Sequence, residues 1–169
     1  MTSDDWAHVD LGNQIDNSWN KDSALALKLG NLSFIIRIRE SEKKEIEKKH
    51  IRMLNVKERK DRKLKRKKVI MIYSFLLYKL LKESGGGFKK VRLCRDINPP
   101  KDVYRFIGII CKYYNEPSLM QQGFKIRFKN DGKSRAHNLA NKSYQGRRKE
   151  DYLIKDRDMH DLDKLLRKL

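Results

Sequence analysis

Residues 69–78 read VIMIYSFLLY and form the longest apolar run of the 169-residue chain. The run is apolar on nearly every side of a helix, which is typical of a helix buried at the centre of a domain. It is about half the roughly 20 residues that a membrane-spanning helix needs. Around it, residues 40–83 contain neither glycine nor proline, and Ser84-Gly85-Gly86-Gly87 follows them as a stop signal. We therefore predict one long helix, or two in line, that is solvated before Val69 and forms the core from there on.

Segments rich in β-forming residues flank this helix. Residues 31–39 (NLSFIIRIR), 88–95 (FKKVRLCR) and 123–129 (GFKIRFK) are predicted strands. Asn98-Pro99-Pro100 begins a predicted helix that runs to about Tyr114, because proline fits the first helical turn. Its core-facing residues are predicted to be Val103, Phe106 or Ile107, Ile110 and Tyr114. Residues 20–29 are a predicted short helix, residues 1–20 are expected to be irregular, and residues 134–149 flexible. A last amphipathic helix is predicted over residues 151–169, with Met159, Leu162, Leu166 and Leu169 on one stripe.

These elements predict an α+β fold. A small, mostly antiparallel sheet packs on two or three helices, with a long basic helix and a basic C-terminal tail that ends in the amphipathic helix. Composition divides the chain into an acidic N-terminal arm (1–30), an α+β core with a basic helical extension at 40–68 (31–129), and a basic tail with the last helix (130–169).

The charge of the chain is strongly positive and unevenly distributed. There are 41 Lys and Arg against 22 Asp and Glu, a formal net charge of +19. Residues 1–36 carry 2 basic and 5 acidic groups, whereas residues 37–68 carry 16 basic and 6 acidic groups. Such a balance predicts an anionic polymer or an anionic surface as the partner.

Residues 57–68 (KERKDRKLKRKK) hold 9 basic groups in 12 residues. In a helix they place cations on every side of the axis, where like charges three and four residues apart are destabilising. A phosphate backbone relieves that repulsion and releases counterions, although a solvated helix face is the alternative. The run is also typical of a nuclear-import signal, which makes import factors expected partners. The candidate phosphate contacts are Lys57, Arg59, Lys60, Arg62, Lys63, Lys65, Arg66, Lys67 and Lys68.

Basic and apolar residues alternate in each predicted strand, as they do when one sheet face is buried and the other exposed. The apolar set is Phe34, Ile36, Ile38, Val91, Leu93, Phe124, Ile126 and Phe128, and the basic set is Arg37, Arg39, Lys90, Arg92, Lys125, Arg127 and Lys129. If the strands share one sheet, these seven cations converge on one surface that a nucleic acid could neutralise. Apart from Phe88 no aromatic residue lies among them, which favours phosphate contacts and low sequence specificity. The alternative is an ordinary polar face that is basic because the whole chain is basic.

Three further features have two interpretations each. Arg147, Arg148 and Lys149, preceded by Lys133, Arg135 and Lys142, are either an arm that wraps a nucleic acid or a linker without an ordered role. Trp6 and Trp19 lie in acidic sequence, and either dock into a partner's groove or pin the N-terminal arm onto its own core. The spacing of Leu25, Leu29, Leu32 and Phe34 fits a nuclear-export signal or a segment of core.

Nothing in the sequence indicates a catalytic centre. The four histidines have no partner spacing, and there is no HExxH, paired CxxC or nucleophile elbow. Glu83, Asp96 and Lys101 are the set from which a nuclease site could be imagined. Cys94 and Cys111 lie in apolar stretches, so we expect small core residues in a reducing compartment rather than a disulfide or zinc site. We therefore expect no enzyme, no cofactor and no metal.

The sequence as a whole predicts a non-enzymatic nucleic-acid-binding protein, with RNA ahead of DNA, that contacts phosphates. It would be nuclear, would shuttle between nucleus and cytoplasm, or would be cytoplasmic, because the first residues, MTSDDWAHVD, are unlike a signal peptide. One alternative is a basic structural or assembly protein of viral matrix type that binds anionic membrane or a ribonucleoprotein, which an exposed 159–169 stripe would favour. The other is a protein-binding adaptor that acts through the Trp-bearing arm.

Overall fold

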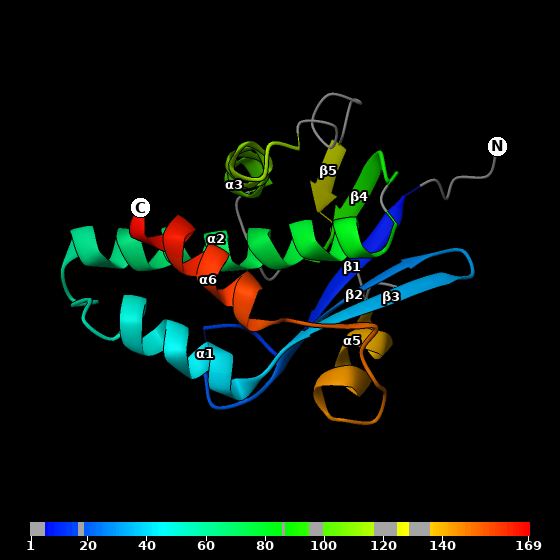
Figure 1. Ribbon diagram of the computed structural model, residues 1–169, viewed down its shortest axis with the longest axis horizontal. Coiled ribbons are helices and arrows are strands. Elements are labelled where there is room, and N and C mark those ends of the chain that lie inside the picture. The colour runs from blue at the N-terminus through cyan, green and yellow to red at the C-terminus, as the bar shows by residue number, and fades with distance from the viewer. Residues whose placement is uncertain (1–5, 17–18, 86, 95–99, 117–124, 129–135) are drawn as a thin grey trace.

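In the part of the chain that the structure describes, six strands form one mixed sheet with helices on both of its faces (Figure 1). The computed structural model describes residues 6–16, 19–85, 87–94, 100–116, 125–128 and 136–169. Its strands are β1 (Ala7–Gly12), β2 (Ser23–Leu29), β3 (Leu32–Ile38), β4 (Lys90–Leu93), β5 (Lys125–Phe128) and β6 (Tyr152–Leu153). Its helices are α1 (Glu40–Ile46), the π-helical η1 (Glu47–Ile51), α2 (Arg59–Glu83), α3 (Pro100–Tyr113), α5 (His137–Tyr144) and α6 (Asp156–Arg167). The predicted α+β class is confirmed.

The strand order is β5-β4-β1-β2-β3-β6. β1, β2 and β3 form an antiparallel meander, which contains the longest ladders of the sheet. β4 adds in parallel to β1, β5 in parallel to β4, and β6 in parallel to β3. The described part of the sheet is therefore antiparallel at its centre and parallel at both edges.

The N-terminal segment contributes two inner strands of this sheet, so the predictions of an irregular segment over 1–20 and a helix over 20–29 are wrong for β1 and β2. In β1, His8 and Asp10 alternate with apolar residues, yet every residue of the strand is buried. In β2, alanine and leucine are good helix formers, but Leu25 and Leu27 alternate with small residues at a period of two. Pairing with strands on both sides decides the conformation here, since tertiary context overrides intrinsic propensity.

The predicted helix over 40–83 is broken into a hairpin. α1 ends in a π-helical turn, where the Arg52 N–H donates to the Glu47 carbonyl at 2.8 Å, and the chain turns back before α2 begins (Figure 1). In the turn, the Asn55 N–H donates to Asp61 at 2.8 Å and the Asn55 side-chain amide donates to Glu58 at 3.2 Å. Asn55 thus provides the turn in a segment without glycine or proline.

The second half of α2 is the central helix of the core, as predicted. Every residue from Val69 to Leu81 is buried, between the sheet on one side and α3 and α6 on the other. The core-facing residues of α3 were also predicted correctly, since Val103, Phe106, Ile107 and Ile110 are buried. No helix in the described ranges is long and apolar enough to cross a membrane.

α6 packs its apolar stripe onto α2. Leu162, Leu165 and Leu166 are at most 1% exposed, whereas Leu169 at the end of the chain is 37% exposed. The predicted helix is thus confirmed with a later start, because residues 152–153 form strand β6. Of the predicted stripe, Leu162 and Leu166 are buried in the protein's own core, Met159 packs against it partly buried, and Leu169 is exposed.

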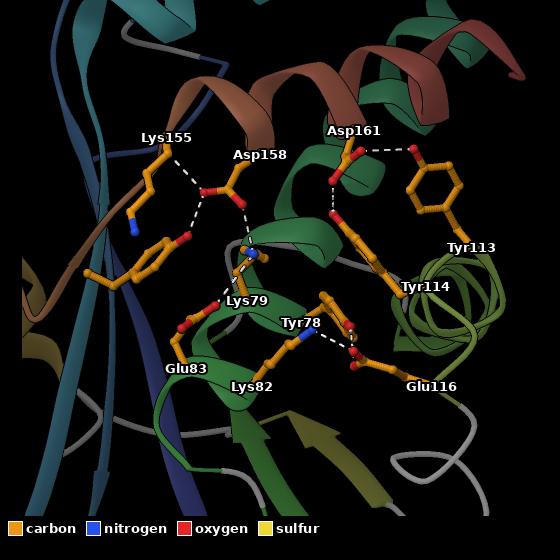
Figure 2. A network of polar contacts seen from close by, with 11 residues as sticks. Tyr78, Lys79, Lys82, Glu83, Tyr113, Tyr114, Glu116, Lys155, Asp158 and Asp161 are labelled. Atoms are coloured by element: carbon orange, nitrogen blue, oxygen red, sulfur yellow. Dashed lines mark hydrogen bonds and ion pairs between the residues drawn. The ribbon is translucent and has the colours of Figure 1, made fainter.

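A buried ion pair fixes the N-terminal end of α6 to α2 (Figure 2). Lys79 Nζ lies 2.7 Å from Asp158 Oδ1 and 3.5 Å from Glu83 Oε1. Asp158 also accepts hydrogen bonds from the Tyr152 hydroxyl at 2.7 Å and the Lys155 N–H at 3.0 Å. Burial opposes the charged form of Asp158, but these donors outweigh it and lower the pKa of the carboxyl.

Two further carboxylates connect the helices. Asp161 accepts hydrogen bonds from the hydroxyls of Tyr113 and Tyr114, at 2.9 and 2.7 Å, which joins α6 to the end of α3 (Figure 2). Glu116 accepts from the Tyr78 hydroxyl and from Lys82, both at 2.5 Å, which joins the α3 end to α2. Together with Lys79, these contacts hold α2, α3 and α6 as one layer.

α5 covers the opposite face of the sheet (Figure 1). Ala136 and Ala140 pack with Ala24, Ala26 and Ile35 in a second, smaller apolar cluster. The prediction of a flexible segment over 134–149 is therefore wrong for 137–144, whose short and polar side chains gave little helical periodicity. Small side chains on both elements let the helix lie close against the strands.

Lys43 of α1 is fully buried beside the start of β2. Its Nζ donates to Ser23 Oγ at 2.7 Å and to the Gln14 carbonyl at 3.4 Å. Burial lowers the pKa of Lys43 from 10.5 to about 8, although Asp22 and Asp16 act in the opposite direction. The amine is thus a buried group whose charge opposes folding.

This pKa predicts a pH dependence of stability. Between about pH 8 and 10.5 the unfolded chain keeps the Lys43 proton and the folded protein loses it, so stability rises with pH. Allowing for solvent screening, the wild type should gain about 2 kcal/mol over this interval relative to Lys43→Met. Urea unfolding of both proteins near neutral pH and at about pH 10 measures the difference. A difference that stays constant with pH would show that the folded amine remains charged.

Candidate nucleic-acid interface

Four cations meet where β4 and β5 lie side by side. The register pairs Lys90 with Lys125 and Arg92 with Arg127. The alternate residues Val91 and Leu93 are fully buried in the α2–α3 core, so the four cations occupy the other face of the sheet. Lys125 and Arg127 are exposed, and Lys90 and Arg92 are partly exposed.

Trp6 lies among these cations, immediately before β1. The Trp6 ring centroid is 5.1 Å from Arg127 Cζ, 5.6 Å from Arg92 Cζ and 5.9 Å from Lys90 Nζ. Each contact of this kind contributes about 0.5–1 kcal/mol at an exposed site. We call Trp6, Lys90, Arg92, Lys125 and Arg127 the β4–β5 cationic face. The sequence interpretation missed the aromatic member, because it treated residues 1–20 as irregular and so gave Trp6 no place beside a strand.

The second group of cations is the first part of α2 with the residues before it, which we call the α2 basic end (residues 57–68). Lys57, Arg59, Lys60, Arg62, Lys63, Arg66 and Lys67 are exposed, and Lys65 and Lys68 are partly buried. The two carboxylates of this stretch, Glu58 and Asp61, accept hydrogen bonds from Asn55. Leaving Arg66 aside, its cations form no ion pair with a carboxylate of the described residues. These like charges stay close together because the helix that carries them is continuous with the buried half of α2, which packs in the core.

The two surfaces lie at opposite ends of α2. Its 25 residues make a helix of about 37 Å, since each residue adds about 1.5 Å. The basic end extends beyond the sheet, whereas β4 begins just after the far end of α2 (Figure 1). The predicted cations therefore form two separate surfaces.

Arg37 and Arg39 do not join the β4–β5 cationic face. Arg37 lies in β3 and Arg39 directly follows it, and β1 and β2 separate β3 from β4. Arg37 Nε lies 3.5 Å from Asp22 and 3.6 Å from Glu150, and Arg39 is paired with Glu42 at 2.6 Å. Both guanidinium groups are therefore matched by carboxylates of the protein itself. Of the predicted strand cations, Lys129 lies outside the described residues.

Arg147, Arg148 and Lys149 of the predicted tail follow α5, and Arg148 contacts β3. The Arg148 guanidinium donates to Ser33 Oγ at 3.2 Å, and the N–H groups of Arg147 and Arg148 donate to the Lys142 carbonyl. Arg147 and Lys149 are exposed. The C-terminal end of α5 is therefore a folded turn, while Lys133 and Arg135 lie outside the described residues.

A series of polar contacts links β1 to α5 on the face of the sheet that α5 covers. His137 Nδ1 lies 3.4 Å from Asp10 Oδ2, and Asn141 Nδ2 lies 2.9 Å from His137 Nε2. If the Asn141 amide donates to Nε2, the proton of a neutral His137 is on Nδ1, facing Asp10. Asp10 also accepts from the Leu11 N–H at 2.8 Å and is 3% exposed. The arrangement joins strand and helix.

The residues considered for chemistry are dispersed. Glu83 contacts Lys79, Lys101 lies in the first turn of α3, and Asp96 lies outside the described residues. Within the described ranges, no three or more His, Cys, Asp or Glu side chains are grouped so that they could hold a metal ion. Trp19, one of the two predicted partner contacts, is partly buried against the main core. The export-like spacing falls in β2 and β3, where Leu25 is a core residue.

Comparison with known proteins gives no relative: no family model, no curated protein and no solved structure matches this chain.

Proposed function

We propose that this protein binds nucleic acid without acting as an enzyme, by contacting phosphate backbones through the α2 basic end and the β4–β5 cationic face. The proposal rests on the α2 basic end, where eight of the nine cations lie on helix α2, Lys57 lies just before it, and the local carboxylates accept hydrogen bonds from Asn55 instead. Like charges three and four residues apart destabilise a helix, and a polyanion relieves this repulsion while releasing its own counterions.

Two contacts favour this proposal over the alternatives drawn from the sequence. A membrane-binding protein of matrix type would use the apolar stripe of α6, but Leu162, Leu165 and Leu166 are buried in the core. An adaptor that acts through tryptophan would present those side chains, but Trp19 packs on the core and Trp6 lies among cations of its own sheet. Each alternative therefore loses one of the features that suggested it.

The test is a salt titration of binding with two variants of equal charge. The α2 variant carries Lys60→Gln, Arg62→Gln, Lys63→Gln and Lys67→Gln, all at exposed positions. The control variant carries Lys21→Gln, Lys101→Gln, Lys112→Gln and Lys164→Gln, which are also exposed. Glutamine retains good helix propensity. Probes are single-stranded RNA, duplex RNA, duplex DNA and phosphatidylserine vesicles, between about 50 and 200 mM salt.

We expect the affinity of the wild type for a nucleic acid to fall steeply with salt. The slope of log Kobs against log salt should be smaller by about 3–4 in the α2 variant, because each lost phosphate contact removes about 0.9, and nearly unchanged in the control. An equal loss in both variants would mean that only net charge matters. Tight vesicle binding with weak binding to all three nucleic acids would contradict the proposal and favour the membrane alternative.

A further inference from the structure

We infer that the protein bridges two separate segments of nucleic acid, an activity that rests on the proposed function but goes beyond it. The reason is the arrangement of the two cationic surfaces. They lie at opposite ends of a helix of about 37 Å and belong to different layers of the fold.

The surfaces also face different directions. In β4, Val91 and Leu93 point into the core beneath α2 and α3, so Lys90 and Arg92 point away from α2. The α2 basic end belongs to the layer on the other side of the sheet (Figure 1). A phosphate backbone on the β4–β5 cationic face therefore lies on the other side of the sheet plane from α2, and the α2 basic end in addition extends beyond the sheet (Figure 1).

The path along α2 between the surfaces lacks the dense cations of its two ends. From Val69 to Leu81 the helix is buried, with α6 packed on it, and Lys79 of this stretch is paired with Asp158. α6 itself carries four carboxylates, Asp156, Asp158, Asp161 and Asp163, against the three cations Arg157, Lys164 and Arg167. A continuous anion that followed α2 would therefore meet no excess of positive charge there.

A short nucleic-acid duplex is too stiff to contact both surfaces. The persistence length of duplex DNA is about 150 base pairs, so a short duplex cannot bend around the fold from one surface to the other. Two short duplexes can each occupy one surface. The α2 basic end has nine cations and the β4–β5 cationic face has four, which is enough for several phosphate contacts on each.

The experiment uses duplexes of about 12 base pairs, roughly 40 Å long, in two populations that carry a donor or an acceptor dye. Energy transfer is measured after the full-length protein is added, with duplex RNA and duplex DNA in separate series. The wild type and the control variant should bring donor and acceptor duplexes together. Native mass spectrometry should show two duplexes on one protein chain.

Two single-surface variants show whether both surfaces are needed. One is the α2 variant, and the other carries Lys125→Gln and Arg127→Gln, which are exposed and can be changed with little cost to folding. Thermal unfolding of each variant checks that it is folded. Each should still bind a duplex, but energy transfer should fall at least fivefold and the stoichiometry should be one duplex per chain.

The outcomes separate the two proposals. Binding of a single duplex by the wild type without energy transfer would overturn bridging and leave the proposed function intact. Absence of any duplex binding would overturn bridging, and the proposed function would fall with it if single-stranded RNA were not bound either. Energy transfer that persists in both single-surface variants would overturn the inference, because self-association of the protein would then bring the duplexes together.

Discussion

Replacing Lys79 with methionine is expected to lower the free energy of unfolding by about 3–5 kcal/mol, which is typical of breaking a buried ion pair. Lys79 Nζ lies 2.7 Å from Asp158, whose side chain is only 5% exposed. Without the ammonium group, the Asp158 carboxylate stays buried with hydrogen-bond donors but no countercharge. Glu83, 3.5 Å from the same ammonium group, loses its partner as well. Chemical denaturation of the two proteins measures the loss.

A second substitution separates the lost charge from lost packing. Asp158→Asn added to Lys79→Met removes the uncompensated charge but leaves an acceptor for Tyr152 and the Lys155 N–H. The double variant should recover most of the stability that Lys79→Met loses. Lys67→Met, an exposed change on the same helix, should alter stability by less than about 0.5 kcal/mol. If Lys79→Met cost no more than Lys67→Met, the ion pair would not hold α6 in place.

Gly12→Ala should destabilise the protein by about 3 kcal/mol or more, near the upper end of the effects of overpacking. A Cβ at this position would lie 2.4 Å from the Ala140 carbonyl oxygen and 2.9 Å from the Asn141 nitrogen. Both are backbone atoms of α5, so no side-chain rotation relieves the clash. The helix must move away from β1 and the contact between His137 and Asp10 must break.

Urea unfolding and amide hydrogen exchange together test this prediction. Exchange should accelerate in α5, while the amides of the buried half of α2, on the other face of the sheet, stay protected. Adding Ala140→Gly should not restore stability, because the clash is with the carbonyl rather than with the methyl group. Wild-type stability in Gly12→Ala would contradict the close approach of α5 to β1.

The elements that the sequence predicted well are those with dense or regular apolar residues. The buried half of α2 and the core face of α3 are examples, and so are the alternating strands β3, β4 and β5. β1 and β2 were not predicted, because pairing with neighbouring strands makes them strands and their local residue patterns alone do not mark them as such. His8 and Asp10 are of residue types that are mostly exposed in proteins, yet strands on both sides and α5 bury them. The break at Asn55 was missed because only one turn-forming residue marks it.

The candidate interface was predicted only in part, because local sequence reveals some of its features and not others. Composition alone reveals the α2 basic end, and alternation reveals that Lys90, Arg92, Lys125 and Arg127 share a face. Local sequence does not determine the order of strands in a sheet, so the separation of Arg37 and Arg39 from that face could not be predicted. Nor could their carboxylate partners, which come from the segment before β2, from α1 and from the segment before β6.

The salt dependence of duplex binding by a combined variant decides whether the two cationic surfaces hold the phosphates. It carries the four α2 substitutions together with Lys90→Gln, Arg92→Gln, Lys125→Gln and Arg127→Gln. If the two surfaces make the phosphate contacts, the slope of log Kobs against log salt should fall by about 7 from the wild type, at about 0.9 for each of the eight contacts. The control variant should keep the wild-type slope. A folded combined variant that retained the wild-type slope would contradict the account, because the phosphates would then be bound elsewhere on the chain.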